Sequence, residues 1–211
     1  MTDADAAQTL AHFVPEPVAR KLLAGGGAQL EPVEAKATIL LCDIAAFTEL
    51  TESLGPHRVI EFLNAYFDVL VGIVDRHRGV VTQFQGDAIL AVFNVPLPDP
   101  DHGAAAVHAA IEIVQATDRQ AFAGVRVSNR VGICTGRVVA GVVGAHGMLS
   151  YTVHGNAVNL AARLEQLNKE YGTRILLSGK TAERCPGIPL RRVDETLIRG
   201  HAEPVTLYTP A

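Results

Sequence analysis

Short apolar runs and two amphipathic segments alternate along the first two thirds of the chain. Residues 38–43 (TILLCD) form an apolar run that ends on a carboxylate, a pattern typical of a buried strand. A long helix is predicted from about residue 57 to 77, with a second over residues 101–117. The apolar face of the first helix is formed by Val59, Leu63, Tyr66, Leu70 and Val74.

The segments that follow these helices read as strands. Residues 80–84 and 88–94 flank a tight turn at 85–87, which predicts a hairpin. Further strands are predicted at 125–135 and 138–143, separated by Gly136-Arg137, and then at 149–153 and 205–208. The order strand, helix, strand, strand, helix, strand predicts an α+β fold. We expect a ferredoxin-like sandwich (βαββαβ core) with additional C-terminal strands.

The chain divides into a short leading segment and one domain. Residues 1–36 are predicted to hold a helix at 17–24, stopped by the glycines at 25–27, and a linker at 31–36. Residues 37–211 are expected to form the functional domain. A turn is predicted at 144–147.

Composition narrows the class of protein. The 211 residues are 48% hydrophobic and 19% charged, which is typical of one globular domain. A net charge of −4 argues against sequence-independent binding of nucleic acid, and no apolar run is long enough to span a membrane. The three cysteines, with no C-x-x-C pair, predict free thiols and a cytoplasmic location.

Two aspartates are the first candidates for chemistry. Asp43 ends the first predicted strand, and Asp87 lies in the hairpin turn. The predicted topology sets that strand beside the hairpin, so both carboxylates would meet at one edge of the sheet. Such oxygen ligands suit Mg²⁺ or Mn²⁺ and a substrate phosphate. The alternative is that each aspartate only serves a turn or a helix cap.

Three other segments bear on nucleotide binding. Residues 44–48 lead into a predicted helical turn at 49–54, whose first backbone N–H groups could hold phosphate. Residues 178–181 (SGKT) end like a Walker sequence but lack its first glycine, so they are interpreted as a loop entering a helix. Asn159 and Arg163 lie four apart on a predicted helix and share a face. That face is either ordinary surface or directed at a reacting phosphate.

Four ordered motifs together resemble the class III adenylyl and guanylyl cyclase family. They are LCDIAAFT (41–48), FQGDAILAVF (84–93), GICTGRVVAGVVG (132–144) and YTVHGNAVNLAARLE (151–165). The resemblance covers roughly residues 34–210. It implies a nucleotidyl cyclase, which forms a 3′,5′-cyclic nucleotide and pyrophosphate from a nucleoside triphosphate.

The resemblance also assigns roles at the metal and phosphate end. Asp43 and Asp87, assisted by the Ile44 carbonyl, would hold two divalent ions, Mg²⁺ or Mn²⁺. These ions would promote in-line attack of the ribose 3′-hydroxyl on the α-phosphate. Phe47 and Thr48 would lie in the phosphate-binding turn.

The remaining roles implied by the resemblance require a second copy of the chain. Asn159 would orient the ribose and Arg163 would stabilise the transition state, both contributed by the opposite subunit. A head-to-tail homodimer with two shared sites is therefore expected, and a monomer should be inactive.

Two departures from the family pattern concern substrate recognition. Gln83 and Thr152 stand where adenylyl cyclases usually carry Lys and Asp, and where guanylyl cyclases typically carry Glu and Cys. Amide and hydroxyl groups both donate and accept, so ATP is expected with weaker selectivity than usual. Arg199-Gly200-His201 replaces a frequent Lys-Gly-Lys, and either Arg199 or His201 would contact the terminal phosphates.

Two alternatives to an adenylyl cyclase stay open at this stage. One is a guanylyl cyclase or another nucleotidyl cyclase. The other is a catalytically silent cyclase-like module that dimerises and binds nucleotide to regulate another protein.

Overall fold

Strand β1 (Val33–Ile44) lies inside the sheet, between β3 (Ala88–Phe93) and β4 (Asn129–Ala145), and is antiparallel to both. In this computed structural model, residues 15, 17–20, 31–145 and 148–211 are described. Strand β2 (Val80–Gln85) pairs with the outer side of β3, giving the order β2-β3-β1-β4. That is the strand order of a ferredoxin-like core, so the predicted fold class is confirmed.

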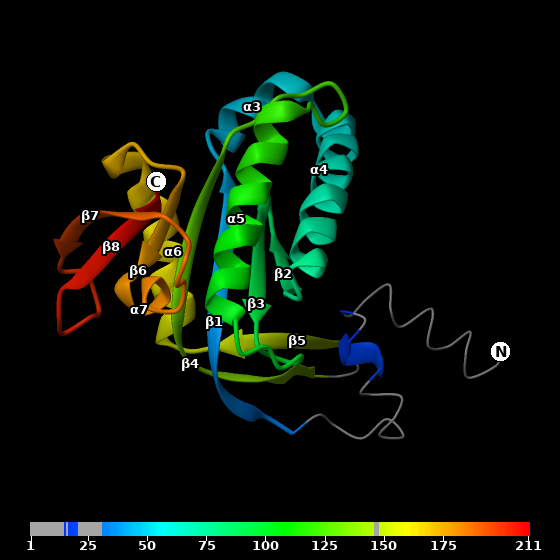
Figure 1. Ribbon diagram of the computed structural model, residues 1–211. Coiled ribbons are helices and arrows are strands. Elements are labelled where there is room, and N and C mark those ends of the chain that lie inside the picture. The colour runs from blue at the N-terminus through cyan, green and yellow to red at the C-terminus, as the bar shows by residue number, and fades with distance from the viewer. Residues whose placement is uncertain (1–14, 16, 21–30, 146–147) are drawn as a thin grey trace.

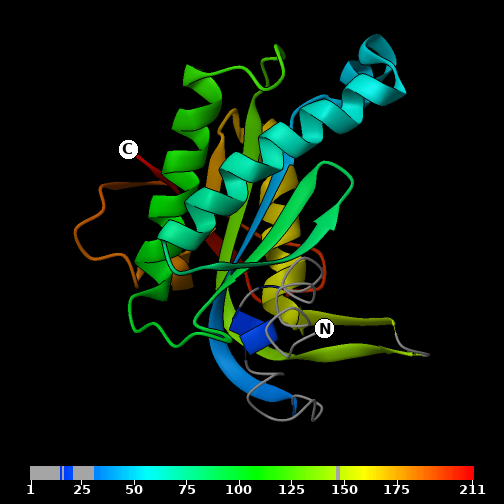
Figure 2. The same ribbon diagram turned by 90° about the vertical axis from the view of Figure 1, so that its right-hand side faces the viewer.

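The C-terminal strands extend this core to eight strands within the described residues. Beyond β4 come β6 (Ile175–Ser178), β8 (Val205–Pro210) and the edge strand β7 (Leu190–Thr196). Strand β5 (Met148–His154) pairs with the distal part of β4. The β4–β5 ribbon extends away from the lower end of the sheet (Figures 1 and 2).

Helices cover both faces of the sheet. Helices α4 (Pro56–Arg76) and α5 (His102–Arg119) pack on one face, over a core that includes Leu40 and Ile133. Helix α6 (Asn156–Tyr171) packs on the opposite face, over a second core that includes Ile39. Leu40 and Ile39 are neighbours in β1 and face opposite cores because side chains alternate along a strand. The short helices are α3 (Phe47–Leu54) and α7 (Gly179–Ala182).

One predicted break in the sheet does not occur. The Gly136-Arg137 pair was expected to separate two strands, but β4 runs without interruption from Asn129 to Ala145. Gly136 and Arg137 pair with Ala37 and Lys36 of β1, so their backbone hydrogen bonds are satisfied within the ladder. The missing side chain of Gly136 instead leaves room for α6, since a Cβ there would lie 3.0 Å from the Cβ of Ala157.

Other boundaries differ because of pairing that local pattern does not reveal. Strand β1 begins at Val33, inside the expected linker, because residues 33–36 pair with the distal part of β4. Strands β6 and β7 were not predicted. The first is only four residues long, and the second is a mostly exposed edge strand with a polar sequence.

The remaining expectations are placed as follows. Residues 17–20 are helical and Val18 is buried in the second core, whereas the rest of the predicted 17–24 helix lies outside the described residues. Residues 144–145 of the predicted turn belong to β4, and 146–147 lie outside the described residues. The SGKT segment does lead into a helix, α7. None of the helices in the described ranges has the length and apolar character needed to cross a bilayer.

Candidate active site

The end of β1 and the β2–β3 turn bring two carboxylates together, as the sequence predicts. Gln85 pairs with Ala88 across the hairpin, which leaves Asp87 in the turn beside the end of β1. The backbone N–H of Ile44 donates to Asp43 Oδ1 at 2.8 Å and to Asp87 Oδ2 at 3.2 Å. One amide therefore joins the two acidic side chains.

This proximity changes the acidity of the pair. The pKa of Asp87 rises from 3.8 to about 7, because the side chain is partly buried and because Asp43 contributes a hydrogen bond and a negative charge. The described residues hold no group of three or more His, Cys, Asp or Glu side chains placed to bind a metal ion. Two carboxylates with a backbone carbonyl alongside are hard oxygen ligands of the kind that Mg²⁺ and Mn²⁺ accept, with waters or substrate phosphate completing the shell. The residues present fit such ions.

A buried polar cluster lies directly beneath Asp43. Asn129, opposite Ile44 in β4, donates its side-chain N–H to the hydroxyl of Tyr66 and to Cys42 Sγ, the latter at 3.1 Å. All three side chains are buried, and burial raises the pKa of the Cys42 thiol to about 12. The cluster ties the end of β1 to α4 and β4. No sequence motif pointed to it.

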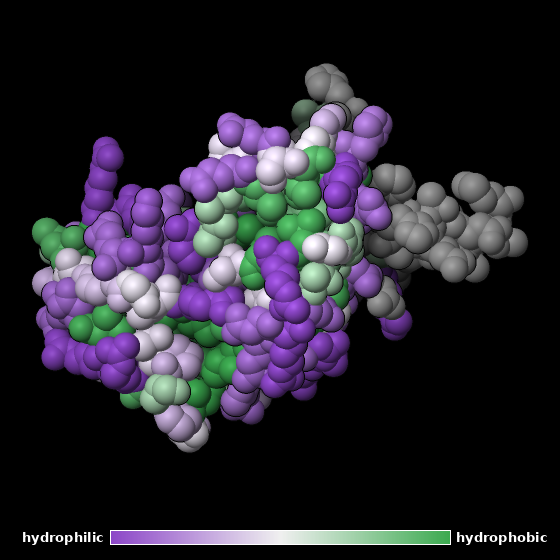
Figure 3. Space-filling view, turned by 90° about the horizontal axis from the view of Figure 1, so that it is seen from above, coloured by the Kyte–Doolittle hydropathy of each residue, from purple (hydrophilic) through white to green (hydrophobic). Residues whose placement is uncertain are grey.

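Helix α3 starts immediately after the carboxylate end of β1. Ala46 adopts the left-handed backbone conformation (φ 58°) as its N-cap and provides no side-chain cap. The first N–H groups of α3 are therefore open to an external acceptor. The helix begins at Phe47, two residues earlier than predicted; Phe47 packs partly against the core and Thr48 is exposed. Viewed from above, this end shows apolar patches bordered by polar side chains (Figure 3).

The predicted base-reading residues also meet. Gln83 Nε2 on β2 donates to Thr152 Oγ1 on β5 at 2.8 Å, although 69 residues separate them in the sequence. Thr152 is buried, with 4% of its surface exposed, and Gln83 is half-buried. Gln85 Nε2 in turn donates to Gln83 Oε1 at 2.7 Å. The sequence motifs gave no reason to include Gln85.

Helix α6 carries the other predicted pair. Asn159 is exposed and Arg163 is half-buried. The guanidinium of Arg163 lies against Gly200, where an added Cβ would be 3.1 Å from Arg163 Nη1. Gly200 has a φ of +80°, so glycine suits this position on both counts. The structure thus places Arg163 beside the loop of Arg199 and His201.

An ion pair fixes α6 to the start of β4. Arg130 Nε lies 3.1 Å from Glu165 Oε1, and Arg130 is paired with Asp43 across the sheet. Neither atom makes a well-aligned hydrogen bond within the described residues. The pKa of Glu165 rises to about 7 because burial and the charge of Asp43 outweigh the attraction of Arg130. This pair was not predicted, because Arg130 lies outside the four motifs and only Glu165 belongs to one of them.

The predicted residues therefore form three groups rather than one. They are the Asp43–Asp87 pair with α3, the Gln83–Thr152 pair, and Arg163 with the loop of residues 199–201. No direct hydrogen bond or ion pair joins these groups within the described part of the chain.

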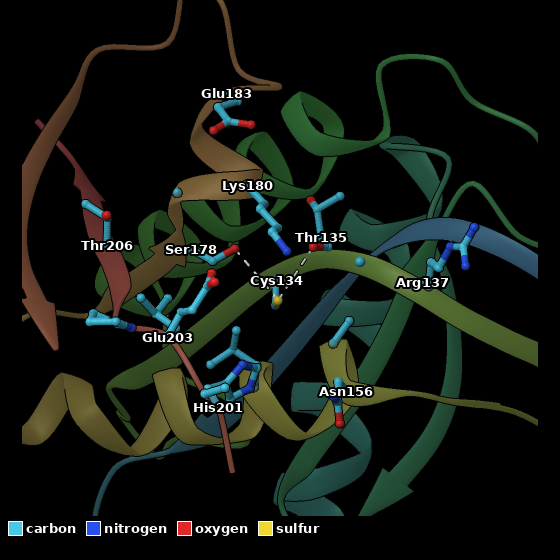
Figure 4. Close-up of a pocket in the computed structure, with 17 residues that line it drawn as sticks. Cys134, Thr135, Arg137, Asn156, Ser178, Lys180, Glu183, His201, Glu203 and Thr206 are labelled. Carbon is cyan, nitrogen blue, oxygen red and sulfur yellow. Dashed lines mark hydrogen bonds between the residues drawn. The ribbon is translucent and has the colours of Figure 1, made fainter. Parts of the chain in front are cut away.

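One cavity lies apart from the carboxylate pair. It has a volume of about 570 Å³ and lies between β4, the start of α6, α7 and the loop at 201–206. Lys180 points across it toward Thr135 and Cys134, with His201 on the opposite side (Figure 4). Of the predicted site residues, only His201 lines this cavity.

Comparison with known proteins places these features in a family. The profile described as adenylate and guanylate cyclase catalytic domain matches residues 31–209. Adenylate cyclase 1 of Rhizobium meliloti is 33% identical over 212 residues, which cover 97% of this chain and 32% of that protein. The chain spans about a third of the length of the curated relatives it matches first.

Solved structures of both specificities resemble the fold. The adenylyl cyclase CyaB of P. aeruginosa has a TM-score of 0.74 and 28% identity, covering 86% of this chain and 96% of that one. The guanylyl cyclase Cya2 has a TM-score of 0.73 and 28% identity, covering 85% and 93%. With the profile matched over residues 31–209, well over half of the chain, this protein belongs to the adenylate and guanylate cyclase catalytic domain family.

Proposed function

We propose that this chain converts ATP to 3′,5′-cyclic AMP and pyrophosphate at two sites shared by a head-to-tail homodimer. The observation that carries the proposal is the convergence of Asp43 and Asp87 on the Ile44 amide, with the pKa of Asp87 raised to about 7. Two adjacent carboxylates with no basic partner are costly in a folded protein unless a cation binds them.

Asp43 and Asp87, with the Ile44 carbonyl, would hold two divalent ions, Mg²⁺ or Mn²⁺. When bound, the ions would lower the pKa of the ribose 3′-hydroxyl and neutralise charge on the triphosphate and the departing pyrophosphate. Phe47 and Thr48 begin α3, whose uncapped N–H groups would donate hydrogen bonds to phosphate oxygens. The buried cluster beneath Asp43 would keep its carboxylate in place.

The groups on α6 would act in the partner's site. In the reaction, ribose O3′ bonds to the α-phosphorus while the bond to the bridging pyrophosphate oxygen breaks, and the hydroxyl proton passes to water. Arg163 would stabilise the charge developing on the phosphoryl oxygens, and Asn159 would orient the ribose. Arg199 and His201, beside Arg163, would contact the terminal phosphates. The separation of these groups from Asp43 and Asp87 within one chain supports a shared site.

Gln83 and Thr152 would read the base. Adenine presents an acceptor at N1 and a donor at N6, and the hydrogen-bonded pair offers both a donor and an acceptor. Relatives named adenylate cyclases support ATP as the substrate. We place the catalytic domain at residues 37–211, with residues 1–36 as an attached segment whose last four residues belong to β1. The three buried, free cysteines fit a reducing cytoplasm.

Product analysis tests this proposal directly. Purified protein is given ATP, GTP, CTP or UTP, each with Mn²⁺ and with Mg²⁺, and the products are identified by mass. Cyclic AMP from ATP is the expected result. A cyclic guanine or pyrimidine nucleotide as the main product would keep the cyclase mechanism and overturn the substrate. No product from a folded dimer would favour the silent regulatory module.

A further inference from the structure

Three polar side chains form a directional hydrogen-bond relay at the base-reading position. Gln85 Nε2 donates to Gln83 Oε1 at 2.7 Å, and Gln83 Nε2 donates to Thr152 Oγ1 at 2.8 Å. Gln83 and Gln85 are two apart on β2, so both project from the same face. Phe84 projects from the opposite face and packs against Phe67 in a tilted arrangement, with ring centroids 4.6 Å apart.

The direction of this relay decides what Gln83 offers to a ligand. Its carbonyl oxygen is engaged by Gln85, and one of its two amide N–H groups is engaged by Thr152. No other hydrogen bond within the described residues uses the remaining N–H, so Gln83 presents a donor more readily than its carbonyl oxygen, which already accepts from Gln85. Adenine N1 accepts a hydrogen bond, whereas guanine carries a hydrogen on N1 and donates. The donor form of Gln83 therefore matches adenine and opposes guanine at this atom.

We infer that Gln85 is a specificity-determining residue, which selects adenine by holding the Gln83 side-chain amide in its donor orientation. The inference rests on the proposed cyclase function and names a positioning residue for the same site. Gln85 acts only through Gln83, and we assign it no direct contact with the base.

The same relay can run in the opposite direction. If both amides turn, Gln83 donates to residue 85 and accepts from the Thr152 hydroxyl, which serves equally as donor or acceptor. Gln83 then presents its carbonyl oxygen, which matches the N1–H of guanine. A carboxylate at position 85 can only accept, so it enforces this reversed direction. Gln85→Glu keeps the size of the side chain and changes only the direction of the hydrogen bonds in the relay.

The test compares kcat/KM for ATP and GTP in the dimer of this chain. Gln85→Glu should lower the ATP:GTP ratio about tenfold, the effect of exchanging one hydrogen bond of ordinary strength. Gln85→Leu removes the donor without adding an acceptor, so it should lower the ratio less. Gln120→Glu adds the same charge at the exposed end of α5 and should leave the ratio unchanged. Thermal unfolding of each variant checks that it is folded.

Several outcomes would overturn the inference while leaving the cyclase function in place. They are an unchanged ATP:GTP ratio in Gln85→Glu, an equal change in Gln120→Glu, and a wild type that prefers GTP. If the wild type forms no cyclic product, the proposed function fails separately. Competitive binding of 3′-deoxy-ATP and 3′-deoxy-GTP then measures the same ratio without turnover, and an unchanged affinity ratio in Gln85→Glu would count against the relay.

Discussion

The carboxylates of Asp43 and Asp87 accept hydrogen bonds from one and the same backbone N–H, that of Ile44. This links a strand end to a hairpin turn 44 residues away and holds two like charges next to each other. The raised pKa of Asp87 indicates that the arrangement costs stability in the absence of a cation, and under the proposed function it would provide ligands for one. The first two predictions concern this balance.

Replacing Asp87 with Asn should stabilise the metal-free protein at alkaline pH. The pKa of Asp87 is about 7 in the folded protein and near 3.8 when unfolded, so protonation of this side chain favours the folded state. That contribution to the free energy of unfolding is lost as pH rises from about 4 to 7. Above pH 7 the variant should be more stable by on the order of 1 kcal/mol, since solvent screens part of the repulsion. Urea unfolding in chelator at pH 5 and pH 8 measures this. Equal pH dependence in both proteins would contradict it.

Divalent ions should stabilise the wild type and should have no such effect on Asp43→Ala or Asp87→Ala. At a concentration one hundred times the dissociation constant, binding to the folded state adds about 2.7 kcal/mol. Thermal unfolding with and without Mn²⁺ measures the effect, and both variants should also lose product formation at least a hundredfold. Asp68→Ala, an exposed carboxylate on α4, is the control and should respond like wild type. A normal Mn²⁺ response in Asp87→Ala would remove that residue from the ion site.

Two inactive variants should restore each other's activity. In a mixture of Asp87→Ala and Arg163→Ala, one site of each heterodimer combines intact carboxylates from one chain with an intact Arg163 from the other. Random subunit exchange should therefore recover about a quarter of wild-type activity per chain, because half the dimers are mixed and each has one working site. Activity is measured before and after exchange, with mixing verified by differently tagged chains. Verified exchange without recovery would show that the site is not shared.

Breaking the Arg130–Glu165 pair should destabilise the fold in a pH-dependent way. Arg130→Met leaves Glu165, only 4% exposed, without its partner, at an expected cost of roughly 2–4 kcal/mol at pH 8. The cost should be smaller at pH 5.5, because a protonated Glu165 leaves no buried charge without a partner. Urea unfolding at both pH values tests this. The double variant Arg130→Met, Glu165→Leu should recover most of the lost stability. If Arg130→Met costs the same at both pH values and the double variant recovers nothing, the pair is not energetically coupled.

Gly132 is expected to tolerate no side chain. A Cβ there would lie 2.0 Å from the carbonyl oxygen of Ala161 and 2.4 Å from the Glu165 backbone nitrogen, so α6 would have to move away from β4. Gly132→Ala should cost about 3 kcal/mol or more. The same substitution at Gly72, inside α4, should stabilise by about 0.5–1 kcal/mol through helix propensity, because its nearest neighbour there is 3.6 Å away. Similar stability changes in both variants would refute the close packing of α6.

The core of the fold and the carboxylate pair could be predicted because both depend on local pattern. Helical spacing marked α4 and α5, and the turn at Gly86-Asp87 marked the hairpin. Once the strand order is known, Asp43 and Asp87 must lie at the same end of adjacent strands. Four motifs in one order then pointed to the cyclase family, which the profile match confirms.

What only the tertiary structure decided depends on partners far apart in the sequence. The continuity of β4 through Gly136 follows from pairing with β1, and the short strand β6 exists because the sheet offers it an edge. The Arg130–Glu165 pair joins β4 to α6, and the relay from Gln85 to Thr152 joins β2 to β5. The hydrophobic periodicity of a helix or strand indicates which of its faces is buried. It does not indicate which side chain of another element lies opposite that face. The sequence by itself therefore determined the core helices and strands and the two acidic residues. The tertiary structure decided which polar side chains contact one another around those residues.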